Sequence, residues 1–465
     1  MAQIDKEAVN GEMRRLPSVE KLLEEALLKP YIDKYSRPLV TTAVQQTLTG
    51  LRKQIKEGAT CPDAAAIIEE AGLNLEREWG GLLCSVINGS GVILHTNMGR
   101  APLSPLTIKA ISELGGGYTP LEFDLASGER GHRTIELEKL LCLLGGADSA
   151  LVVNNNAAAV FLILKALASG KEVIVSRGEL VQIGGGFRLP EIMAQSDVKL
   201  VEVGTTNKTY LEDYENAITP QTGLILKVHR SNFALRGFSH EPTVPELAKL
   251  AYHKKLPFVY DIGSGAFKDT EKFGLEHEPT IGESINGDAD VTCFSGDKLM
   301  GGPQAGIILG KKKYLDTIRK HPFMRTVRIG GLVAMALEAT LLDYFKNDAA
   351  SVPVWQMIAL SAEEIGKRAA RAVKKLKQAG IEAEVIAGAS MVGGGSLPDQ
   401  TLSSKLISVN PPVSVTQFAK KLRLGSPAVI GRTQEDRFLI DLRTVFPSLD
   451  DKLAQAIINA VEKGR

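Results

Sequence analysis

The sequence lacks the features that mark several common classes of protein. Its 465 residues contain only four cysteines, and these are widely separated, with no CxxC pair and no Cys/His cluster. We therefore expect reduced thiols, no disulfide framework and no bound metal. No segment reaches the roughly 18 apolar residues of a membrane span, and the first residues have no apolar core of signal-peptide length. These absences predict a cytoplasmic protein with no membrane partner.

The chain also lacks an excess of charge of either sign. Lysine and arginine together number 55, against 54 for aspartate and glutamate. Whole-chain charge therefore gives no argument for a nucleic acid as partner, and any such interaction must be local. The length exceeds the usual size of a single hydrophobic core, so two or three domains are expected.

Residues 1–60 have the pattern of a small helical domain. In the stretch PLVTTAVQQTLTGLRKQIKEG, apolar residues recur at the spacing of three and four that predicts an amphipathic helix. Its modest basic excess is, taken alone, more typical of a solvated face than of an RNA-binding surface. We expect residues 61–87 to be a linker.

Residues 88–330 alternate between short apolar strands and helices. The predicted strands are GVILHT, ALVVN, KEVIVS, VKLVEVG, GLILKVH, PFVYDIG, DVTCF and AGIILG. Near-continuous apolar strands joined by helical crossovers predict an α/β domain with a mostly parallel sheet covered on both faces. Residues 331–465 begin with long helices and end in strands, which predicts a smaller C-terminal α+β domain.

Three features of the α/β domain match the needs of pyridoxal phosphate chemistry, which requires a lysine, an acid for the pyridine nitrogen and amides for the phosphate. Lys298 lies in FSGDKLMGGPQAG, between two predicted strands, and Asp261 ends the strand PFVYDIG. A strand runs directly into a helix at NNNAAA, where free N–H groups attract an anion. We call this proposed phosphate-binding segment the asparagine cup, and its residues are Asn154, Asn155, Asn156 and Ala157.

Each of these signals has an ordinary structural alternative. A strand-ending aspartate often forms a turn or caps a helix, a loop lysine is usually solvated, and asparagines before a helix can serve as its cap. The order of cup, acid and lysine, with strands and helices between them, is nevertheless typical of the large domain of fold-type I pyridoxal phosphate enzymes. His229 follows a strand on the same side, where it either contacts the cofactor ring, transfers protons or is structural.

Several arginines lie close to these elements in the sequence. Arg100 follows a predicted strand, Arg130 and Arg133 precede a helix, and Arg325 and Arg328 would share a face if HPFMRTVRIGG is helical. Each arginine taken singly is better explained by a carboxylate partner or a helix end. Together they indicate a second, phosphate-like ligand.

Long motifs along nearly the whole chain resemble the bacterial selenocysteine synthase family. They are LPSVEKLL, INGSGVILHTNMGRAPLS, VVNNNAAAV, VSRGELVQIGGGFRLPEIM, LKVHRSNF, YDIGSG, FSGDKLMGGPQAGIILG and FMRTVRIGG. The resemblance implies a fold-type I, aspartate aminotransferase-like enzyme that converts seryl-tRNA(Sec) to selenocysteinyl-tRNA(Sec) with selenophosphate. It also implies pyridoxal 5'-phosphate, an external aldimine, an aminoacrylyl-tRNA intermediate and a homodecamer built as a pentamer of dimers.

The resemblance also assigns roles to individual residues. Lys298 is implied to form the Schiff base, Asp297 to handle protons and Asp261 to face the pyridine nitrogen. The residues implied to surround the selenium donor are Arg100, Arg133, Arg325 and Arg328. The N-terminal domain is implied to grip the tRNA, and its candidate contacts are Arg14, Arg15, Arg37, Arg52 and Lys53.

Two other functions remain compatible with these motifs. One is a β-eliminating lyase of the same fold that acts on a small amino acid or an amino-sugar phosphate. The other is a non-catalytic RNA-binding or scaffold protein, against which the presence of both Lys298 and Asp261 argues.

Overall fold

The computed structural model describes residues 6–79, 84–131, 133–183 and 186–462. Contacts divide the chain into two units, residues 1–85 and 86–465. Within the described ranges, no helix is both long enough and apolar enough to cross a membrane. The four cysteines are free thiols.

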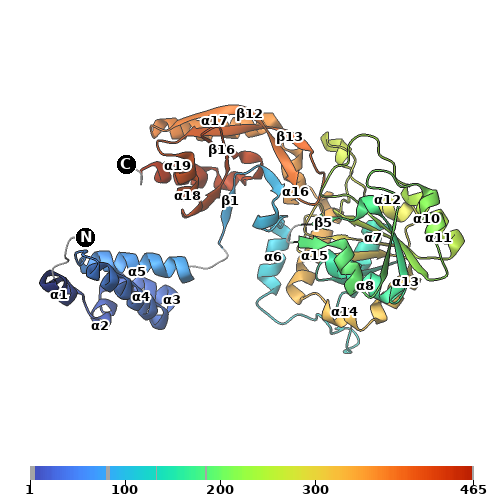
Figure 1. Ribbon diagram of the computed structural model, residues 1–465, viewed down its shortest axis with the longest axis horizontal. Coiled ribbons are helices and arrows are strands. Elements are labelled where there is room, and N and C mark those ends of the chain that lie inside the picture. Colours follow the sequence, from blue (N-terminus) through green and yellow to red (C-terminus); the bar gives the residue numbers. More distant parts are fainter. Residues whose placement is uncertain (1–5, 80–83, 132, 184–185, 463–465) are drawn as a thin grey trace. The chain divides into compact units, whose positions relative to one another are not determined.

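The first unit is a helical domain (Figure 1), and it has its own hydrophobic core. Its helices are α1 (Lys6–Arg15), α2 (Val19–Leu23), α3 (Lys29–Tyr35), α4 (Arg37–Lys56) and α5 (Ala64–Trp79). Helix α5 lies in the stretch that we expected to be a linker, and this prediction is corrected. Its Ile67 and Leu75 are buried against Val44 and Leu48 of α4, so the apolar stripe of α4 is covered by a helix beyond residue 60.

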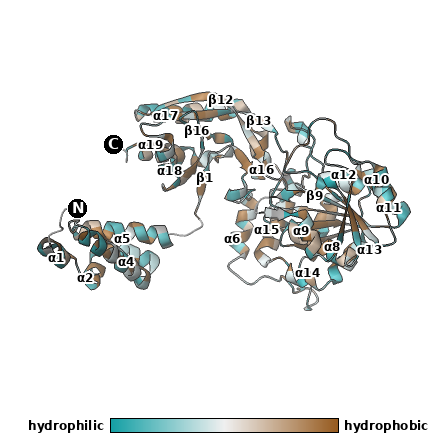
Figure 2. Cartoon of the chain, viewed as in Figure 1, coloured by the Kyte–Doolittle hydropathy of each residue, from teal (hydrophilic) through white to brown (hydrophobic). Residues whose placement is uncertain are grey.

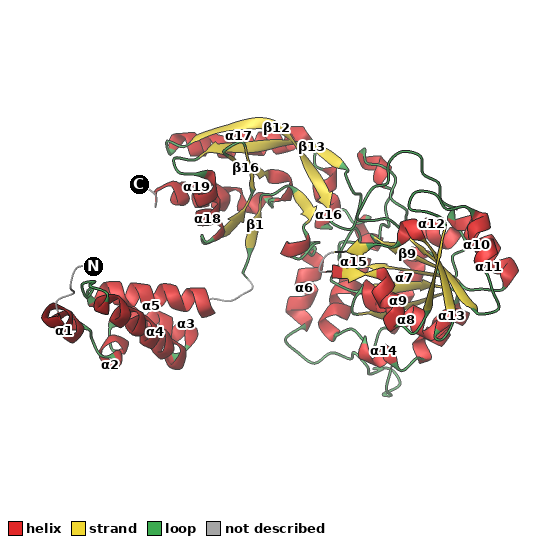
Figure 3. Cartoon of the chain, in the orientation of Figure 1, coloured by secondary structure: helices red, strands yellow, loops and turns green. Residues whose placement is uncertain are grey.

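The second unit contains a seven-stranded sheet with helices on both faces (Figure 3). The strand order is β3-β11-β10-β9-β8-β4-β7, in which β11 alone is antiparallel to its neighbours. The strands are β3 (Ser149–Val153), β4 (Glu172–Ser176), β7 (Lys199–Val203), β8 (Thr222–Val228), β9 (Phe258–Gly263), β10 (Val291–Ser295) and β11 (Gly306–Gly310). The α/β fold class with a mostly parallel sheet is confirmed.

Several helices surround this sheet, and some of them connect its successive parallel strands. They are α6 (Pro105–Leu114), α7 (Ile135–Gly145), α8 (Asn156–Ala168), α9 (Leu189–Gln195), α10 (Leu211–Ala217), α11 (Val244–Lys254), α12 (Ile281–Asn286), α13 (Lys312–Lys320), α14 (Phe323–Thr326), α15 (Gly331–Asn347) and α16 (Pro353–Ala359). A short hairpin, β5 (Gln182–Ile183) with β6 (Phe187–Arg188), precedes α9.

The two faces of the sheet carry separate hydrophobic cores, because successive side chains of a strand point to opposite faces. In β3, Ala150 and Val152 belong to the core that includes α7, α11 and α15, whereas Leu151 and Val153 belong to the core that includes α8, α9 and α13. Both faces are therefore apolar, as the brown colour of these strands shows (Figure 2). This two-sided burial accounts for the continuous apolar runs in the sequence.

A second, five-stranded sheet has the order β15-β16-β13-β12-β2, and a separate parallel pair joins β1 to β14. These strands are β1 (Val86–Asn88), β2 (Val92–Leu94), β12 (Glu382–Gly393), β13 (Thr401–Asn410), β14 (Ala428–Ile430), β15 (Arg432–Gln434) and β16 (Arg437–Asp441). Their core is completed by α17 (Ala362–Gln378), α18 (Val415–Arg423) and α19 (Asp450–Glu462).

The predicted boundaries at residues 88 and 331 differ from the structure. Strand β2, which lies within the predicted GVILHT strand, pairs in parallel with β12 and not with the α/β sheet. Conversely, Leu337 of α15 and Trp355 of α16 are buried in the core that covers the seven-stranded sheet. The sequence could not reveal which sheet β2 joins or which core buries α15 and α16, because the apolar pattern of a short segment is compatible with either position.

The connection between β12 and β13 approaches the α/β sheet through two glycines. Gly393 and Gly395 have φ values of +117° and +84°, which L side chains rarely adopt. A Cβ on Gly395 would lie 2.6 Å from Nζ of Lys298. The C-terminal strands therefore deliver bare backbone to the candidate lysine.

Candidate functional site

A cavity of about 230 Å³ lies where the parallel strands of the seven-stranded sheet end. Carboxyl ends of parallel strands collect ligand-binding residues because the loops that follow them meet at one edge. Of the residues predicted from the sequence, the lining contains Arg100, Asn155, Asn156, Ala157, His229, Asp261, Asp297 and Lys298. Three widely separated motifs of the sequence therefore meet at one place.

Lys298 lies in the tight connection between β10 and β11 and is 3% exposed. Burial lowers the pKa of its amine, and the neighbouring Arg100 guanidinium lowers that pKa further. The carboxylates of Asp261 and Asp297 act in the opposite direction but do not outweigh burial. The amine is therefore held closer to its neutral, nucleophilic form than a surface lysine would be.

Asp297 is fixed beside Lys298 by Arg100. Nη1 of Arg100 donates to Oδ2 of Asp297 at 2.9 Å, and the Asp297 carbonyl accepts from the backbone N–H of Ala101 at 3.2 Å. Oδ1 of Asp297 is buried and has no hydrogen-bond partner within the described residues. One oxygen is therefore bound to a cation while the other is free for a proton or a ligand.

Asp261 is held against the first residue of α8. Nδ2 of Asn156 donates to Oδ1 of Asp261 at 2.8 Å. Burial raises the pKa of the Asp261 carboxyl, although this hydrogen bond and the nearby Lys298 lower it. A cation placed against this carboxylate would compensate for its burial.

The asparagine cup has two distinct roles in the structure. Oδ1 of Asn155 accepts from the N–H of Ala158 at 2.8 Å, so Asn155 is the N-cap of α8, as the structural alternative predicts. The N–H of Asn154 donates to the Val327 carbonyl at 2.9 Å and therefore faces another segment. The first N–H groups of α8, on Asn156 and Ala157, precede any intrahelical acceptor and are suited to an anion.

Pyridoxal phosphate fits this set of residues. Three buried polar atoms of the lining, Asn156 Oδ1, Asp297 Oδ1 and His229 Nε2, have no hydrogen bond to any described residue. The lining also supplies an amine with a lowered pKa, a carboxyl with a raised pKa and a helix N-terminus. These groups match the aldehyde, ring nitrogen and phosphate of the cofactor.

Two residues of the site were missed by the sequence analysis. Glu278, between β9 and α12, is 2% exposed, and its Oε1 lies 3.2 Å from Nε2 of His229. Gly395 approaches Lys298 from the C-terminal strands. The run of three glycines at 393–395 was a signal for Gly395, whereas a single glutamate in a loop gives none.

The four predicted donor-binding arginines do not gather in this cavity within one chain. Only Arg100 lines it. Arg133 and Arg328 instead converge on Glu122, with donor–acceptor distances of 2.9 Å each, and Arg130 binds the same carboxylate at 2.9 Å. Hydrogen bonding from Arg133 lowers the pKa of Glu122. Three guanidinium groups therefore share one carboxylate.

Arg325 and Arg328 do not share a helix face, which corrects the prediction made from their spacing. Helix α14 ends at Thr326, and Arg328 forms an isolated bridge with Val153 at the end of β3. Arg325 is exposed on α14 and has no ion pair to any described residue. The helix ends before Arg328 because this residue pairs with the edge strand β3.

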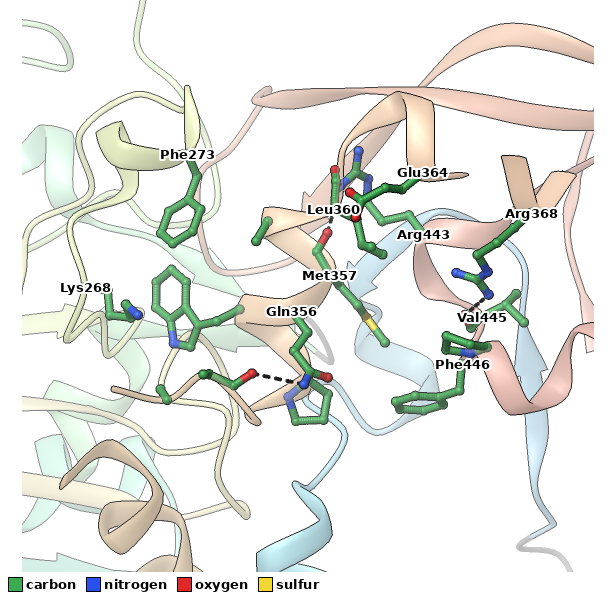
Figure 4. Close-up of a pocket in the computed structure, with 16 residues that line it drawn as sticks. Lys268, Phe273, Gln356, Met357, Leu360, Glu364, Arg368, Arg443, Val445 and Phe446 are labelled. Atoms are coloured by element: carbon green, nitrogen blue, oxygen red, sulfur yellow. Dashed lines mark hydrogen bonds between the residues drawn. The ribbon is translucent and has the colours of Figure 1, made fainter. Parts of the chain in front are cut away.

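A second cavity, of about 520 Å³, lies beside α16 and contains no comparable chemistry (Figure 4). Its walls are mainly apolar and include Phe273 and Trp355. Its arginines are already bound: Arg368 donates to the Val445 carbonyl at 2.6 Å, and Arg443 to the Met357 carbonyl at 2.7 Å. Size alone therefore does not identify the reactive site.

Comparisons with known proteins identify the family of the chain. The family described as L-seryl-tRNA selenium transferase matches residues 86–446, and the one described as selenocysteine synthase N terminal matches residues 13–52. The chain is 45% identical over 444 residues to the L-seryl-tRNA(Sec) selenium transferase of Carboxydothermus hydrogenoformans, covering 94% of this chain and 95% of that protein. It is 45% identical over 459 residues to the one of Geobacter sulfurreducens, covering 97% and 98%.

A solved structure shares the fold at much lower sequence identity. The structure of D-glucosaminate-6-phosphate ammonia-lyase matches with a TM-score of 0.59 and 18% identity, covering 84% of this chain and 98% of that one. The architecture is that of the fold-type I pyridoxal phosphate enzymes. Because the family match extends over most of the chain, the protein belongs to the L-seryl-tRNA selenium transferase family.

Proposed function

We propose that this protein converts seryl-tRNA(Sec) to selenocysteinyl-tRNA(Sec), with selenophosphate as the selenium donor. The observation that carries the proposal is the buried Lys298 amine, which shares a cavity with Asp261 and the start of α8 in a chain of this family. An amine with a lowered pKa, an acid and an anion-binding helix end are the three groups that the cofactor of this fold needs.

Pyridoxal 5'-phosphate is the cofactor that we propose for the cavity. Lys298 would hold its aldehyde carbon, Asp261 its ring nitrogen and the N–H groups of Asn156 and Ala157 its phosphate. When bound, the cofactor supplies an electron sink that acidifies the hydrogen on the seryl α-carbon. A protonated ring nitrogen held against Asp261 would lower the raised pKa of that carboxyl, because it would supply the cation that compensates for burial.

The residues of the chain handle the protons of the reaction. Lys298 is suited to take the α-hydrogen and later to return it, because its lowered pKa keeps more of the amine uncharged near neutral pH. Asp297 is suited to protonate the departing β-hydroxyl through Oδ1, which has no other partner among the described side chains. Arg100, bound to Oδ2, holds that carboxyl in position.

The arginines that converge on Glu122 are our candidates for holding the selenium donor, together with Arg100 and Arg325. Guanidinium groups bind phosphate-like oxygens in pairs and keep their charge at all relevant pH values. Three such groups on one carboxylate leave a positive excess next to Val153, the last residue of the strand that leads to the cofactor cup. Glu122 then serves as a counter-ion that the donor anion must outcompete.

We propose that the first unit binds the tRNA. Arg14, Arg52 and Lys53 are exposed, whereas Arg15 and Arg37 are partly neutralised by Glu12 and Glu20 at 3.0 and 3.3 Å. Exposed cations without a carboxylate partner are the ones that release counter-ions from a nucleic acid on binding. The tRNA contact is therefore expected mainly from α1 and the C-terminal half of α4.

We also propose a homo-oligomer, with the homodecamer that the sequence resemblance implies as its form. Large apolar side chains are exposed around the segment from α6 to α7, where a soluble monomer would show few in one region. They are Leu114, Tyr118, Phe123, Leu125, Ile135 and Leu332. A second copy of the chain would cover them.

The decisive experiment follows labelled selenium from selenophosphate to purified seryl-tRNA(Sec), with free serine and bulk seryl-tRNA as competing acceptors. Label should appear on the selenocysteine tRNA alone. Replacing Lys298 by alanine should reduce transfer by about a thousandfold or more, since it removes the cofactor link and the base together. If no tRNA is labelled while cofactor still links reducibly to Lys298, the small-molecule lyase becomes the better assignment.

Gly395→Ala should weaken the link between Lys298 and the cofactor. Its new Cβ would lie 2.6 Å from Nζ and 2.8 Å from Cε, so the lysine must move. Gly380→Ala is the matched control, because Gly380 has a similar φ of +75° but nothing within 4 Å. Both should lose about 1 kcal/mol of stability to left-handed strain, but only the first should lose borohydride-reducible cofactor. Equal cofactor loading would contradict the proposed closeness.

Arg133→Ala should raise the apparent KM for selenophosphate about tenfold or more and leave that for seryl-tRNA unchanged, because a charge-assisted contact to the anion is lost. Arg437→Ala is a suitable control, since Arg437 pairs with Glu384 on the C-terminal sheet. Steady-state transfer rates at varied donor concentration measure the effect. An unchanged selenophosphate KM in Arg133→Ala would exclude Arg133 from the donor site.

Removal of residues 1–85 should weaken tRNA binding about tenfold or more while cofactor binding is retained. The cut must follow α5, because ending the deletion at residue 60 would leave α5 without the helix it packs on. Replacing Arg52 and Lys53 by alanine in the full chain should reduce the salt dependence of binding by about two phosphate contacts. Filter binding at several salt concentrations measures both; unchanged affinity after the deletion would exclude the tRNA role.

A further inference from the structure

Glu278 is a buried carboxylate whose position has no explanation in the fold alone. It is 2% exposed, and no lysine or arginine forms an ion pair with it in the described part of the chain. A buried carboxylate without a partner costs several kcal/mol, so such a group is retained where it has a specific contact. Its Oε1 lies 3.2 Å from Nε2 of His229, and its charge also acts to raise the pKa of the Lys298 amine.

Each of the two contacting atoms, Oε1 of Glu278 and Nε2 of His229, has only the other as a neighbouring candidate for a hydrogen bond among the described residues. Oε1 of Glu278 and Nε2 of His229 are both buried, and neither has a hydrogen bond to another described residue. Their distance is suitable for a hydrogen bond, but their present angle is not. The terminal torsions of glutamate and histidine are broad, so a small rotation aligns the two groups at little cost.

Backbone contacts hold both residues in place. The N–H of Glu278 donates to Oγ1 of Thr270 at 3.0 Å, and Thr270 Oγ1 in turn donates to the Glu276 carbonyl at 2.6 Å. On the other side, the N–H of His229 donates to the Asp261 carbonyl at 2.8 Å. The pair is therefore built between two anchored segments, one of which is hydrogen-bonded to the backbone of the candidate cofactor acid.

We propose that Glu278 is a positioning residue that orients the imidazole of His229 in the cofactor cavity and places its proton on Nε2. A neutral imidazole has one donor and one acceptor nitrogen, so a carboxylate at Nε2 makes Nδ1 the acceptor. His229 then offers a defined lone pair instead of two exchanging tautomers. Arg100, Asp261, Asp297 and Lys298 are the other charged groups of this cavity.

This inference rests on the proposed function for its catalytic consequence, but its structural part is independent of selenium transfer. An oriented imidazole contributes to the turnover of a bound substrate more than to the binding of a distant tRNA body. Loss of Glu278 should therefore lower kcat more than it raises the KM for seryl-tRNA. Without the Glu278 carboxylate, the Nδ1 lone pair of His229 is less nucleophilic and is no longer fixed on one nitrogen, so His229 should react more slowly with an electrophile.

The experiment uses the full-length protein and compares Glu278→Gln, Glu278→Asp and the control Glu276→Gln. Glu276 is two residues away and exposed, so its replacement makes the same chemical change outside the cavity. The first readout is the carbethoxylation rate of His229 in cofactor-free protein, followed by peptide mass mapping. The second is the absorption spectrum of bound pyridoxal phosphate, and the third is kcat and KM for selenium transfer.

Glu278→Gln should lower the modification rate of His229 several-fold, shift the cofactor spectrum and lower kcat about tenfold. Glu278→Asp should recover part of each effect, and Glu276→Gln should change none. In a His229→Asn background, Glu278→Gln should have no further effect on kcat, because the two residues act as one unit.

Unchanged His229 reactivity in a folded Glu278→Gln protein would overturn the proposal. So would a full additional loss of kcat in the His229→Asn background, since Glu278 would then act through another group. If wild-type protein transfers no selenium, the proposed function fails, while the reactivity and the cofactor spectrum still decide the role of Glu278.

Discussion

Burial of the Lys298 amine is the constraint on which the rest of the site depends. An ammonium group removed from water is costly, so burial shifts the equilibrium toward the neutral amine, and Arg100 adds to that shift. Asp261 is pushed toward its neutral form for the same reason. The cavity therefore holds an acid and an amine that are both biased against charge, and a ligand with complementary charges would reverse that bias.

The fold meets this constraint by bringing segments from distant parts of the chain to one edge of the sheet. The connection after β10 supplies Lys298, β9 supplies Asp261, and the start of α8 supplies Asn156. The segment after β2 supplies Arg100, which binds Asp297, and the β12–β13 connection supplies Gly395. The C-terminal strands are thus part of the site because the connection between them lies directly against the amine.

Around Glu122, positive charge is likewise compensated by a nearby group of opposite charge. Three guanidinium groups repel one another at short range, and the shared carboxylate offsets part of that repulsion. The lowered pKa of Glu122 means that this counter-ion stays ionised under ordinary conditions. An anion bound here would meet a prearranged group of donors and one competing carboxylate, an arrangement that would favour ligands of higher charge than a simple carboxylate.

The sequence by itself determined the alternation of strands and helices, the two-sided burial of the sheet and the order of cup, acid and lysine, because these depend on local periodicity and on rules of parallel sheets. Only the tertiary structure decided which sheet takes β2, which carboxylate takes Arg133 and Arg328, and where α14 ends. It also revealed the contact of Glu278 with His229 and the approach of Gly395 to Lys298. These features depend on contacts between segments far apart in the chain, and local pattern carries no information about such partners.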